Sequence, residues 1–312
     1  MDGRLQVFSG NANRPLAEQI VSFLNINLSR ATVGTLDNTE TRVKLDDNVR
    51  GCDVFVVQST SAPINHHLME LLLIIDALRR ASAARVTAVI PFYGYARQEK
   101  KSTGREPISA KLVANLIRTA GADRVLTMDL HAPAIEGFFD IPVDHLQAAP
   151  LLAGYINKLH LRDLVIVSPD TGGVGRANSF RDRIGADLAI IARRHTENKS
   201  EEIVDVVGDI EGKHAIIVDD MISTGRTAIN AARALYERGA KSVYACATHG
   251  VFSANALSVL PEAGLVETVV TDTILASGDY AHAGVQMISV APLFAEAITR
   301  IHKNLSLSAL FS

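Results

Sequence analysis

Short runs of consecutive apolar residues recur along the chain, and longer stretches of mixed polarity separate them. The runs that we interpret as strands cover residues 54–57, 86–90, 125–128, 164–167, 215–218, 243–246 and 268–270. Continuous apolar runs are typical of strands buried on both faces, as in parallel sheets. Helices are expected between them, over residues 68–80, 110–120 and 227–238. This alternation predicts an α/β fold in which helices flank a mainly parallel sheet.

The two halves of the chain resemble each other. Residues 9–12, 51–57, 78–90 and 149–153 match residues 168–171, 212–218, 235–247 and 291–295 in the same order. The shared order predicts two tandem domains of similar fold, over residues 1–147 and 148–312. The first copy is longer between its third strand and the next one. The excess falls on the polar stretch 95–105, where we expect an acquired function.

Composition and charge exclude several classes of protein. The chain has 312 residues, a length of about two domains, and a formal net charge of -3 with no basic block. Nucleic acid is therefore not expected as a partner. The apolar run 71–75 is too short to span a bilayer, and the N-terminus shows no secretory signal, so we expect a cytoplasmic protein without a membrane partner. Cys52 and Cys246 lie in or beside apolar runs, which indicates buried free thiols rather than a redox pair.

The strongest chemical signal is the segment DDMISTGRT at residues 219–227, directly after an apolar run. Two carboxylates at the end of a strand are placed to accept hydrogen bonds from the vicinal hydroxyls of a ribose. The backbone N–H groups that follow, with a helix N-terminus behind them, form a cradle for a phosphate. An alternative interpretation is an Asx turn with Ser223 or Thr224 as the helix N-cap. The residues expected to bind the sugar phosphate are Asp219, Asp220, Ser223, Thr224, Gly225, Arg226 and Thr227.

This loop resembles the phosphoribosyl-pyrophosphate motif of the phosphoribosyltransferase superfamily. Within that superfamily, residues 90–108, beginning IPFYGYARQ, resemble the ATP-loop region of ribose-phosphate pyrophosphokinases. Residues 128–145, with MDLHAP and GFFDIPVDH, and the chain end SALFS are similar to the same family. The resemblance runs from about residue 5 to the last residue. It implies two tandem phosphoribosyltransferase-type domains, the first carrying an ATP loop and the second a ribose-phosphate loop.

The resemblance also implies an activity. A magnesium-dependent transferase of nucleotide biosynthesis is expected to move the diphosphoryl group of ATP to C1 of ribose 5-phosphate, giving phosphoribosyl pyrophosphate and AMP. The residues expected to bind ATP are Arg97, Gln98, Glu99, Leu36, Asn38 and Glu40. Those expected to be catalytic are Arg193, His131 and His195, and those expected to contact Mg²⁺ are His131 and Asp170. Arg97 suits a phosphate because its guanidinium pairs in a bidentate fork.

Several of these positions depart from the family pattern. Leu36 stands where the family has a phenylalanine in the adenine pocket, across a subunit contact, and Asn38 stands where it has an aspartate. Arg193 replaces a lysine of the catalytic flexible loop, and His195 replaces an arginine two places on. Ser223 and Arg226 are further departures in the ribose loop, and Thr171 is one in the segment after residue 168.

Two alternatives to an active synthetase stay open at this point. One is a non-catalytic regulatory paralogue that binds an active relative. The other is a phosphoribosyltransferase, which is disfavoured by Arg97, Gln98 and His131 because it needs no ATP loop. The family resemblance further implies a homo-oligomer, expected to be a hexamer, with inorganic phosphate and ADP as regulators.

Overall fold

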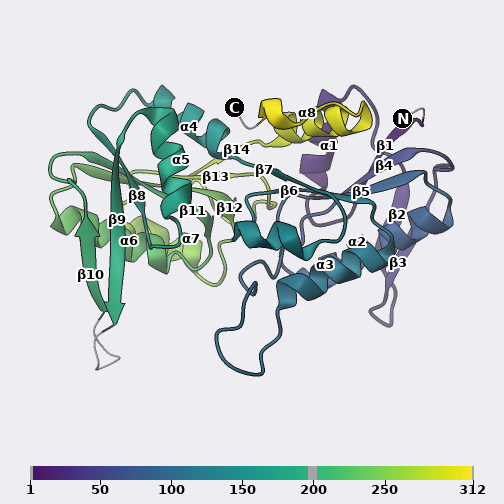
Figure 1. Cartoon of the computed structure of the whole chain (residues 1–312), viewed down its shortest axis with the longest axis horizontal. Helices are drawn as coiled ribbons and strands as arrows, with labels where there is room; N and C mark the ends of the chain where they lie inside the picture. Colours follow the sequence, from purple (N-terminus) through teal and green to yellow (C-terminus); the bar gives the residue numbers. More distant parts are fainter. Residues whose placement is uncertain (1–2, 196–201, 311–312) are drawn as a thin grey trace. The chain divides into compact units, whose positions relative to one another are not determined.

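The computed structural model of the chain describes residues 3–195 and 202–310, and it describes only the backbone within 193–195 and 202–204 (Figure 1). The chain forms two compact units. Unit 1 holds the chain up to Gln147, together with Thr273–Leu275 and the chain from Ser289 onward. Unit 2 holds Ala148–Asp272 and Ala276–Ile288.

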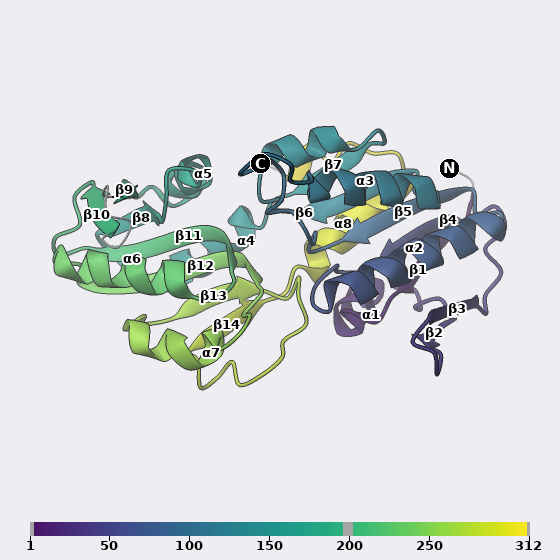
Figure 2. The ribbon, with the colours of Figure 1, turned by 90° about the horizontal axis from the view of Figure 1, so that it is seen from below.

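Unit 1 is built on a parallel sheet. Its strands lie in the order β1 (Leu5–Ser9), β4 (Asp53–Val57), β5 (Arg85–Ile90), β6 (Arg124–Met128) and β7 (Val143–Leu146). The helices α1 (Arg14–Phe23) and α8 (Ala291–His302) lie on one face, and α2 (Ile64–Arg80) and α3 (Ser109–Ala120) on the other (Figures 1 and 2). The antiparallel hairpin of β2 (Ala31–Thr35) and β3 (Thr41–Leu45) packs against α2. Short helices η1 (Pro133–Phe138) and η3 (Ser308–Leu310) complete the unit.

Unit 2 is built on a mixed sheet. Its strands lie in the order β10 (Glu202–Val207), β9 (Asp187–His195), β8 (Leu164–Ser168), β11 (His214–Ile222), β12 (Ser242–Gly250), β13 (Thr268–Thr271) and β14 (Val285–Ile288). All neighbours are parallel except the pair β9 and β10. The helices are α4 (Ala149–Lys158), α5 (Val174–Ile184), α6 (Arg226–Glu237), α7 (Ala256–Val259) and η2 (Leu260–Ala263).

The two units share one topology. The order β1-β4-β5-β6-β7 in unit 1 corresponds to β8-β11-β12-β13-β14 in unit 2. Along the chain, each unit has an antiparallel pair of strands between the first two strands of these orders, β2 and β3 in unit 1 and β9 and β10 in unit 2. This confirms the predicted fold class of two similar α/β copies. The prediction of domains at 1–147 and 148–312 stays a proposal, because α8 ends the second copy by chain order but packs against α1 of unit 1.

The predicted strands and helices are all present. One difference concerns β11, which was expected over residues 215–218 but continues to Ile222. It is longer because β12 runs beside it, pairing Met221 with His249 and Ile222 with Gly250. Cys52 and Cys246 are buried free thiols, as predicted. In the described part of the chain, we find no helix with the length and apolar character needed to cross a membrane.

Candidate active site

The acidic pair of unit 2 lies on β11, in the middle of its sheet. Asp220 is only 2% exposed, and Asp219 is partly buried. The Oδ1 atom of Asp219 accepts a hydrogen bond from the backbone N–H of Asp220 at 2.8 Å. Burial, reinforced by the neighbouring charge of Asp220, raises the pKa of Asp219 to about 7. Two adjacent carboxylates at a largely buried position are costly for the fold, and a raised pKa there is typical of functional sites, which favours a role in ligand binding.

A cation that the sequence analysis missed lies beside this pair. The Nη1 atom of Arg176, on α5, donates to Asp219 Oδ1 at 3.1 Å, and its Nη2 atom lies 3.6 Å from Asp220 Oδ1. Because β8 and β11 are parallel neighbours, the segments that follow them meet at one edge of the sheet. An arginine shortly after β8 was therefore the signal that could have identified this residue.

The loop after β11 has the properties of an anion cradle. Gly225 is the N-cap of α6 with φ 78°, a left-handed conformation that favours glycine, and no side chain caps the helix. The alternative of an N-cap at Ser223 or Thr224 is therefore wrong. Across residues 3–195 and 202–310, we find no acceptor for the N–H groups of Thr224, Gly225, Arg226 and Thr227. Unpaired N–H groups at the start of a 12-residue helix attract a phosphate.

A second loop of unit 2 supports this cradle. The hydroxyls of Ser223 and Ser253 lie 2.9 Å apart in a hydrogen bond, and the N–H of Ser253 donates to the carbonyl of Ser223 at 3.0 Å. Ser223 is thus occupied in holding two loops together, while the side chains of Thr224 and Arg226 are exposed. Arg226 places an additional positive charge in the first turn of α6.

Asp170, predicted to contact the metal, lies between β8 and α5. Its Oδ1 atom accepts from the N–H of Gly173 at 2.9 Å, and its carbonyl accepts from the Ser168 hydroxyl at 2.7 Å. The residue is exposed, so its carboxylate remains accessible. Among the described residues, no group of three or more His, Cys, Asp or Glu side chains could hold a metal ion.

The predicted ATP loop leaves unit 1 between β5 and α3 and projects away from the sheet (Figure 1). Its start is anchored, because the Thr60 hydroxyl accepts from the N–H of Gly94 at 2.6 Å. The Gln98 side chain accepts from the Ser109 hydroxyl, at the first residue of α3, at 2.6 Å. Arg97 is exposed, and within the described ranges its guanidinium has no hydrogen bond or ion pair. It is therefore available to a ligand.

The distal part of this loop is held by its own residues. Glu106 accepts from the N–H groups of Ser102 and Thr103 at 2.8 and 3.0 Å, and from the Thr103 hydroxyl at 2.7 Å. These hydrogen bonds lower the pKa of Glu106. Glu99 forms an ion pair with Lys100 at 3.3 Å. Its predicted contact with ATP stays a prediction.

The remaining predicted ATP residues lie on the turn between β2 and β3. Leu36 is 41% exposed, and its N–H donates to the carbonyl of Glu40 at 2.8 Å. The Asn38 side chain accepts from the N–H of Glu40 at 3.2 Å. In the part of the chain that the structure describes, no hydrogen bond or ion pair joins this turn to Arg97 or Gln98. The turn is thus an exposed feature of its own.

His131 follows β6 and is half-buried. The residue before it is held in place, because the N–H of Leu130 donates to Nε2 of His145 at 2.8 Å. The other ring nitrogen of His145 lies 2.5 Å from Glu136 Oε1. Since Nε2 accepts, Nδ1 carries the proton and donates to Glu136. Arg193 and His195 lie on the backbone of β9, and their side chains are outside the described residues.

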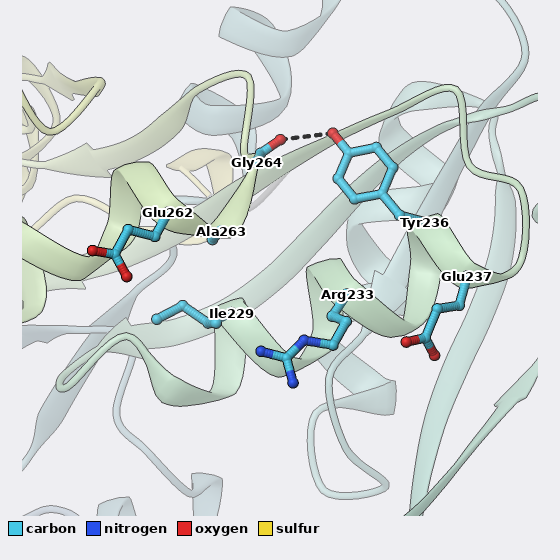
Figure 3. Close-up of a pocket in the computed structure, with 7 residues that line it drawn as sticks. All are labelled: Ile229, Arg233, Tyr236, Glu237, Glu262, Ala263 and Gly264. Atoms are coloured by element: carbon cyan, nitrogen blue, oxygen red, sulfur yellow. Dashed lines mark hydrogen bonds between the residues drawn. The ribbon is translucent and has the colours of Figure 1, made fainter.

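A pocket of about 470 Å³ lies on a different part of unit 2 (Figure 3). It is lined by Ile229, Arg233, Tyr236, Glu237, Glu262, Ala263 and Gly264. The Tyr236 hydroxyl closes one side by donating to the carbonyl of Gly264 at 2.7 Å. None of the predicted site residues lines it, so it is distinct from the ribose-phosphate loop.

Comparison with known proteins identifies the family. Residues 5–121 match the model of the N-terminal domain of ribose phosphate pyrophosphokinase, and residues 193–312 match the phosphoribosyl synthetase-associated domain. A ribose-phosphate pyrophosphokinase of Oceanobacillus iheyensis is 50% identical over 310 residues, covering 99% of this chain and 98% of that protein. The chain belongs to the ribose-phosphate pyrophosphokinase family.

Other members of the family agree with this identification. The ribose-phosphate pyrophosphokinase of Bacillus subtilis is 48% identical over 311 residues, covering 100% of this chain and 98% of that protein. The crystal structure of phosphoribosylpyrophosphate synthetase from Mycobacterium smegmatis superposes with a TM-score of 0.92 at 46% identity, covering 96% of this chain and 99% of that one. The predicted resemblance and fold class are thereby confirmed over the full length.

Proposed function

We propose that this chain is an active ribose-phosphate diphosphokinase, which transfers the diphosphoryl group of ATP to C1 of ribose 5-phosphate. The observation that carries the proposal is the pairing of two carboxylates on β11 with unpaired N–H groups at the start of α6, in a chain related over its full length to ribose-phosphate pyrophosphokinases. A regulatory paralogue is not favoured, because the full-length relatives bear the name of the enzyme.

Unit 2 supplies the acceptor substrate's site in this proposal. Asp219 and Asp220 accept hydrogen bonds from the ribose hydroxyls, and the loop from Ser223 to Thr227 holds the 5-phosphate. The sign of the charges supports this division, because the cradle offers N–H groups and the Arg226 guanidinium to an anion. The carboxylates instead offer only acceptors, which suit sugar hydroxyls.

Unit 1 supplies the nucleotide's site. Arg97, Gln98 and Glu99 contact ATP from the projecting loop, and Leu36, Asn38 and Glu40 contact it from the hairpin turn, across a subunit contact. In the reaction the C1 hydroxyl oxygen bonds to the β-phosphorus, the bond from that phosphorus to the α,β-bridging oxygen breaks, and the hydroxyl proton is released. AMP is the leaving group. Arg193, with His195 and His131, stabilises the charge on the transferred group.

Magnesium is the cofactor in this proposal. Mg²⁺ is typically held by one or two carboxylates plus phosphate oxygens and water, so the exposed carboxylate of Asp170 fits such a site without a cluster of protein ligands. His131 would be the other residue in contact with the ion. When bound, the ion neutralises charge on the polyphosphate. We further propose a cytoplasmic homohexamer regulated by inorganic phosphate and ADP.

The deciding experiment is AMP formation by the purified protein from ATP, with ribose 5-phosphate, magnesium and inorganic phosphate. Sugar-dependent AMP supports the proposal and shows that Leu36 and Arg193 are compatible with turnover. A folded oligomer that binds ribose 5-phosphate but forms no AMP would instead support the regulatory paralogue. Calorimetry with ribose 5-phosphate alone provides that binding measurement.

A further inference from the structure

One buried carboxylate of unit 1 has no place in the reaction described above. Glu70, on α2, is 0% exposed. Burying a carboxylate is costly unless hydrogen bonds compensate it, so its neighbours indicate what it does. It is surrounded by donors from two loops that follow β1 and β4, at the carboxyl ends of these strands.

Both oxygens of Glu70 accept hydrogen bonds. Asn11 donates twice, from its backbone N–H to Oε2 at 3.1 Å and from Nδ2 to Oε1 at 2.6 Å. Gln58 Nε2 donates to Oε2 at 2.7 Å, and His66 Nε2 lies 3.2 Å from Oε1. Charge-assisted hydrogen bonds of this kind are about twice as strong as neutral ones. The carboxylate therefore fixes the positions of Asn11 and Gln58.

The first connection leads from Glu70 to the hairpin. Asn11 Nδ2, held by Glu70, also donates to the carbonyl of Val33 on β2 at 3.2 Å. β2 and β3 form a two-stranded sheet of their own, so the hairpin lacks the hydrogen bonds that a larger sheet would supply. The hairpin also packs against α2, and partly buried residues such as Val33 and Val43 contact the core. The hydrogen bond from Asn11 fixes one point along β2, on the strand that leads into the turn.

The second connection leads from Glu70 to the start of the ATP loop. Gln58, held by Glu70, also donates to the carbonyl of His67 at 3.1 Å and accepts from the N–H of Ala12 at 3.1 Å. Two residues further, the N–H of Thr60 donates to the carbonyl of Phe92 at 2.9 Å, and its hydroxyl accepts from Gly94 at 2.6 Å. The segment 58–60 therefore joins the carboxylate to the loop that carries Arg97.

Gly10 lies directly against the Gln58 side chain that Glu70 holds. A Cβ atom at Gly10 would lie 2.3 Å from Oε1 of the Gln58 side chain, well below any van der Waals contact. The side chain of Gln58 can reach Glu70 and Ala12 together only because residue 10 has no Cβ. The side chains around the Glu70 carboxylate are therefore tightly packed. They lie at the carboxyl ends of β1 and β4, near the segments that are predicted to bind the nucleotide.

We infer that Glu70 is a positioning residue for the nucleotide, which sets the hairpin turn through Asn11 and the base of the ATP loop through Gln58. The inference rests on the proposed function, since both segments are assigned to ATP. It predicts that loss of the carboxylate weakens ATP binding selectively and leaves the ribose 5-phosphate site in unit 2 unaffected.

Two variants test this inference. Glu70→Gln keeps the size of the side chain but places an amide NH₂ group against existing donors, and Asn11→Ala removes the contact with Val33 at an exposed position. Each is expected to raise KM for ATP by about tenfold, since a hydrogen bond to a charged group is lost, with KM for ribose 5-phosphate within about twofold of wild type. Amide hydrogen exchange of residues 31–45 is expected to become faster in both.

A matched control is Asp53→Asn. Asp53 is also a buried carboxylate of unit 1, at the opposite end of β4, where Arg85 donates to it at 2.7 and 2.8 Å. The Asp53→Asn variant should be less stable than wild type but should have an unchanged KM for ATP. Equal changes in KM for ATP and KM for ribose 5-phosphate would overturn the inference, and so would an unchanged KM for ATP in Asn11→Ala. If Glu70→Gln does not fold, the result for Asn11→Ala decides. If wild type forms no AMP, the exchange measurement still tests the hairpin contact separately from the proposed function.

Discussion

Arg176 lies against Asp219, with 3.1 Å between Nη1 and Oδ1, and its other terminal nitrogen lies 3.6 Å from Asp220. One guanidinium thus faces two neighbouring carboxylates that are removed from water. The cation lowers the cost of holding both acids at the sugar site. It links the segment after β8 to the chemistry of β11.

We expect Arg176→Ala to weaken ribose 5-phosphate binding by about ten- to a hundredfold, because hydrogen bonds between charged groups are lost and the repulsion between the acids is uncompensated. Arg176→Lys should retain part of the affinity, since it restores charge but not the planar fork. Calorimetry with the sugar phosphate measures both. Arg181→Ala, on the same helix but paired with Asp182 at the surface, is the control and should bind normally.

The raised pKa of Asp219 has a consequence for stability. Its folded-state pKa of about 7 exceeds the ordinary value of 3.8, so the folded protein binds a proton that the unfolded chain releases. Stability from this group is fully present below about pH 4 and is lost as the pH rises towards 7. The amide introduced by Asp219→Asn does not titrate in this range, so this variant does not lose stability in this way as the pH rises. The gain in free energy of unfolding of Asp219→Asn over wild type should therefore grow between about pH 4 and 7 and then level off.

Denaturant titration without ligand measures this difference, and it avoids the titration of the sugar phosphate itself near pH 6. Asp182→Asn, an exposed change on α5, should show no such trend. A difference between Asp219→Asn and wild type that is constant with pH would contradict the prediction. Above about pH 7, where Asp219 is ionised, Asp219→Asn should bind ribose 5-phosphate more weakly than wild type, because the hydroxyls lose an anionic acceptor.

The central strands of the two sheets were predictable because burial on both faces gives each of them a continuous run of apolar residues. β4 and β5 are apolar at nearly every position, and their helices show the complementary spacing. The hairpin strands β2 and β3 were not predicted, since only one face is covered and their burial alternates along the chain. The extension of β11 to Ile222 also needed the partner strand β12, which no local pattern around Asp219 reveals.

The candidate site likewise has a part that the sequence predicted and a part that it did not. The phosphate cradle is one continuous segment, so its glycine, its acids and its helix start appear together in the sequence. Arg176 and Asp219 are 43 positions apart and meet only because β8 pairs with β11. Glu70 and Asn11 are 59 positions apart, and neither belongs to a chemical motif. Contacts of this kind follow from strand order, which the spacing of motifs does not specify.

Leu36 offers a test of the adenine site. It is 41% exposed at the turn between β2 and β3, where the family has a phenylalanine, so a larger side chain meets no buried neighbour. An aromatic face adds about 0.5–1.5 kcal/mol to a stacked ring. Leu36→Phe should therefore lower KM for ATP by about two- to tenfold and sharpen the preference for ATP over pyrimidine nucleotides, with KM for ribose 5-phosphate unchanged. Steady-state kinetics of the assembled protein measure this.

The control for this variant is Leu112→Phe, the same change at a 56% exposed position of α3, which should leave every kinetic constant unaltered. Combining Leu36→Phe with Asn11→Ala adds a sharper comparison. If the hairpin turn contacts adenine and Asn11 sets its orientation, the benefit of the phenylalanine should shrink in the double variant, because a misplaced ring cannot stack. An undiminished benefit would mean that the turn binds ATP independently of Asn11. No effect of Leu36→Phe in either background would remove the turn from the nucleotide site.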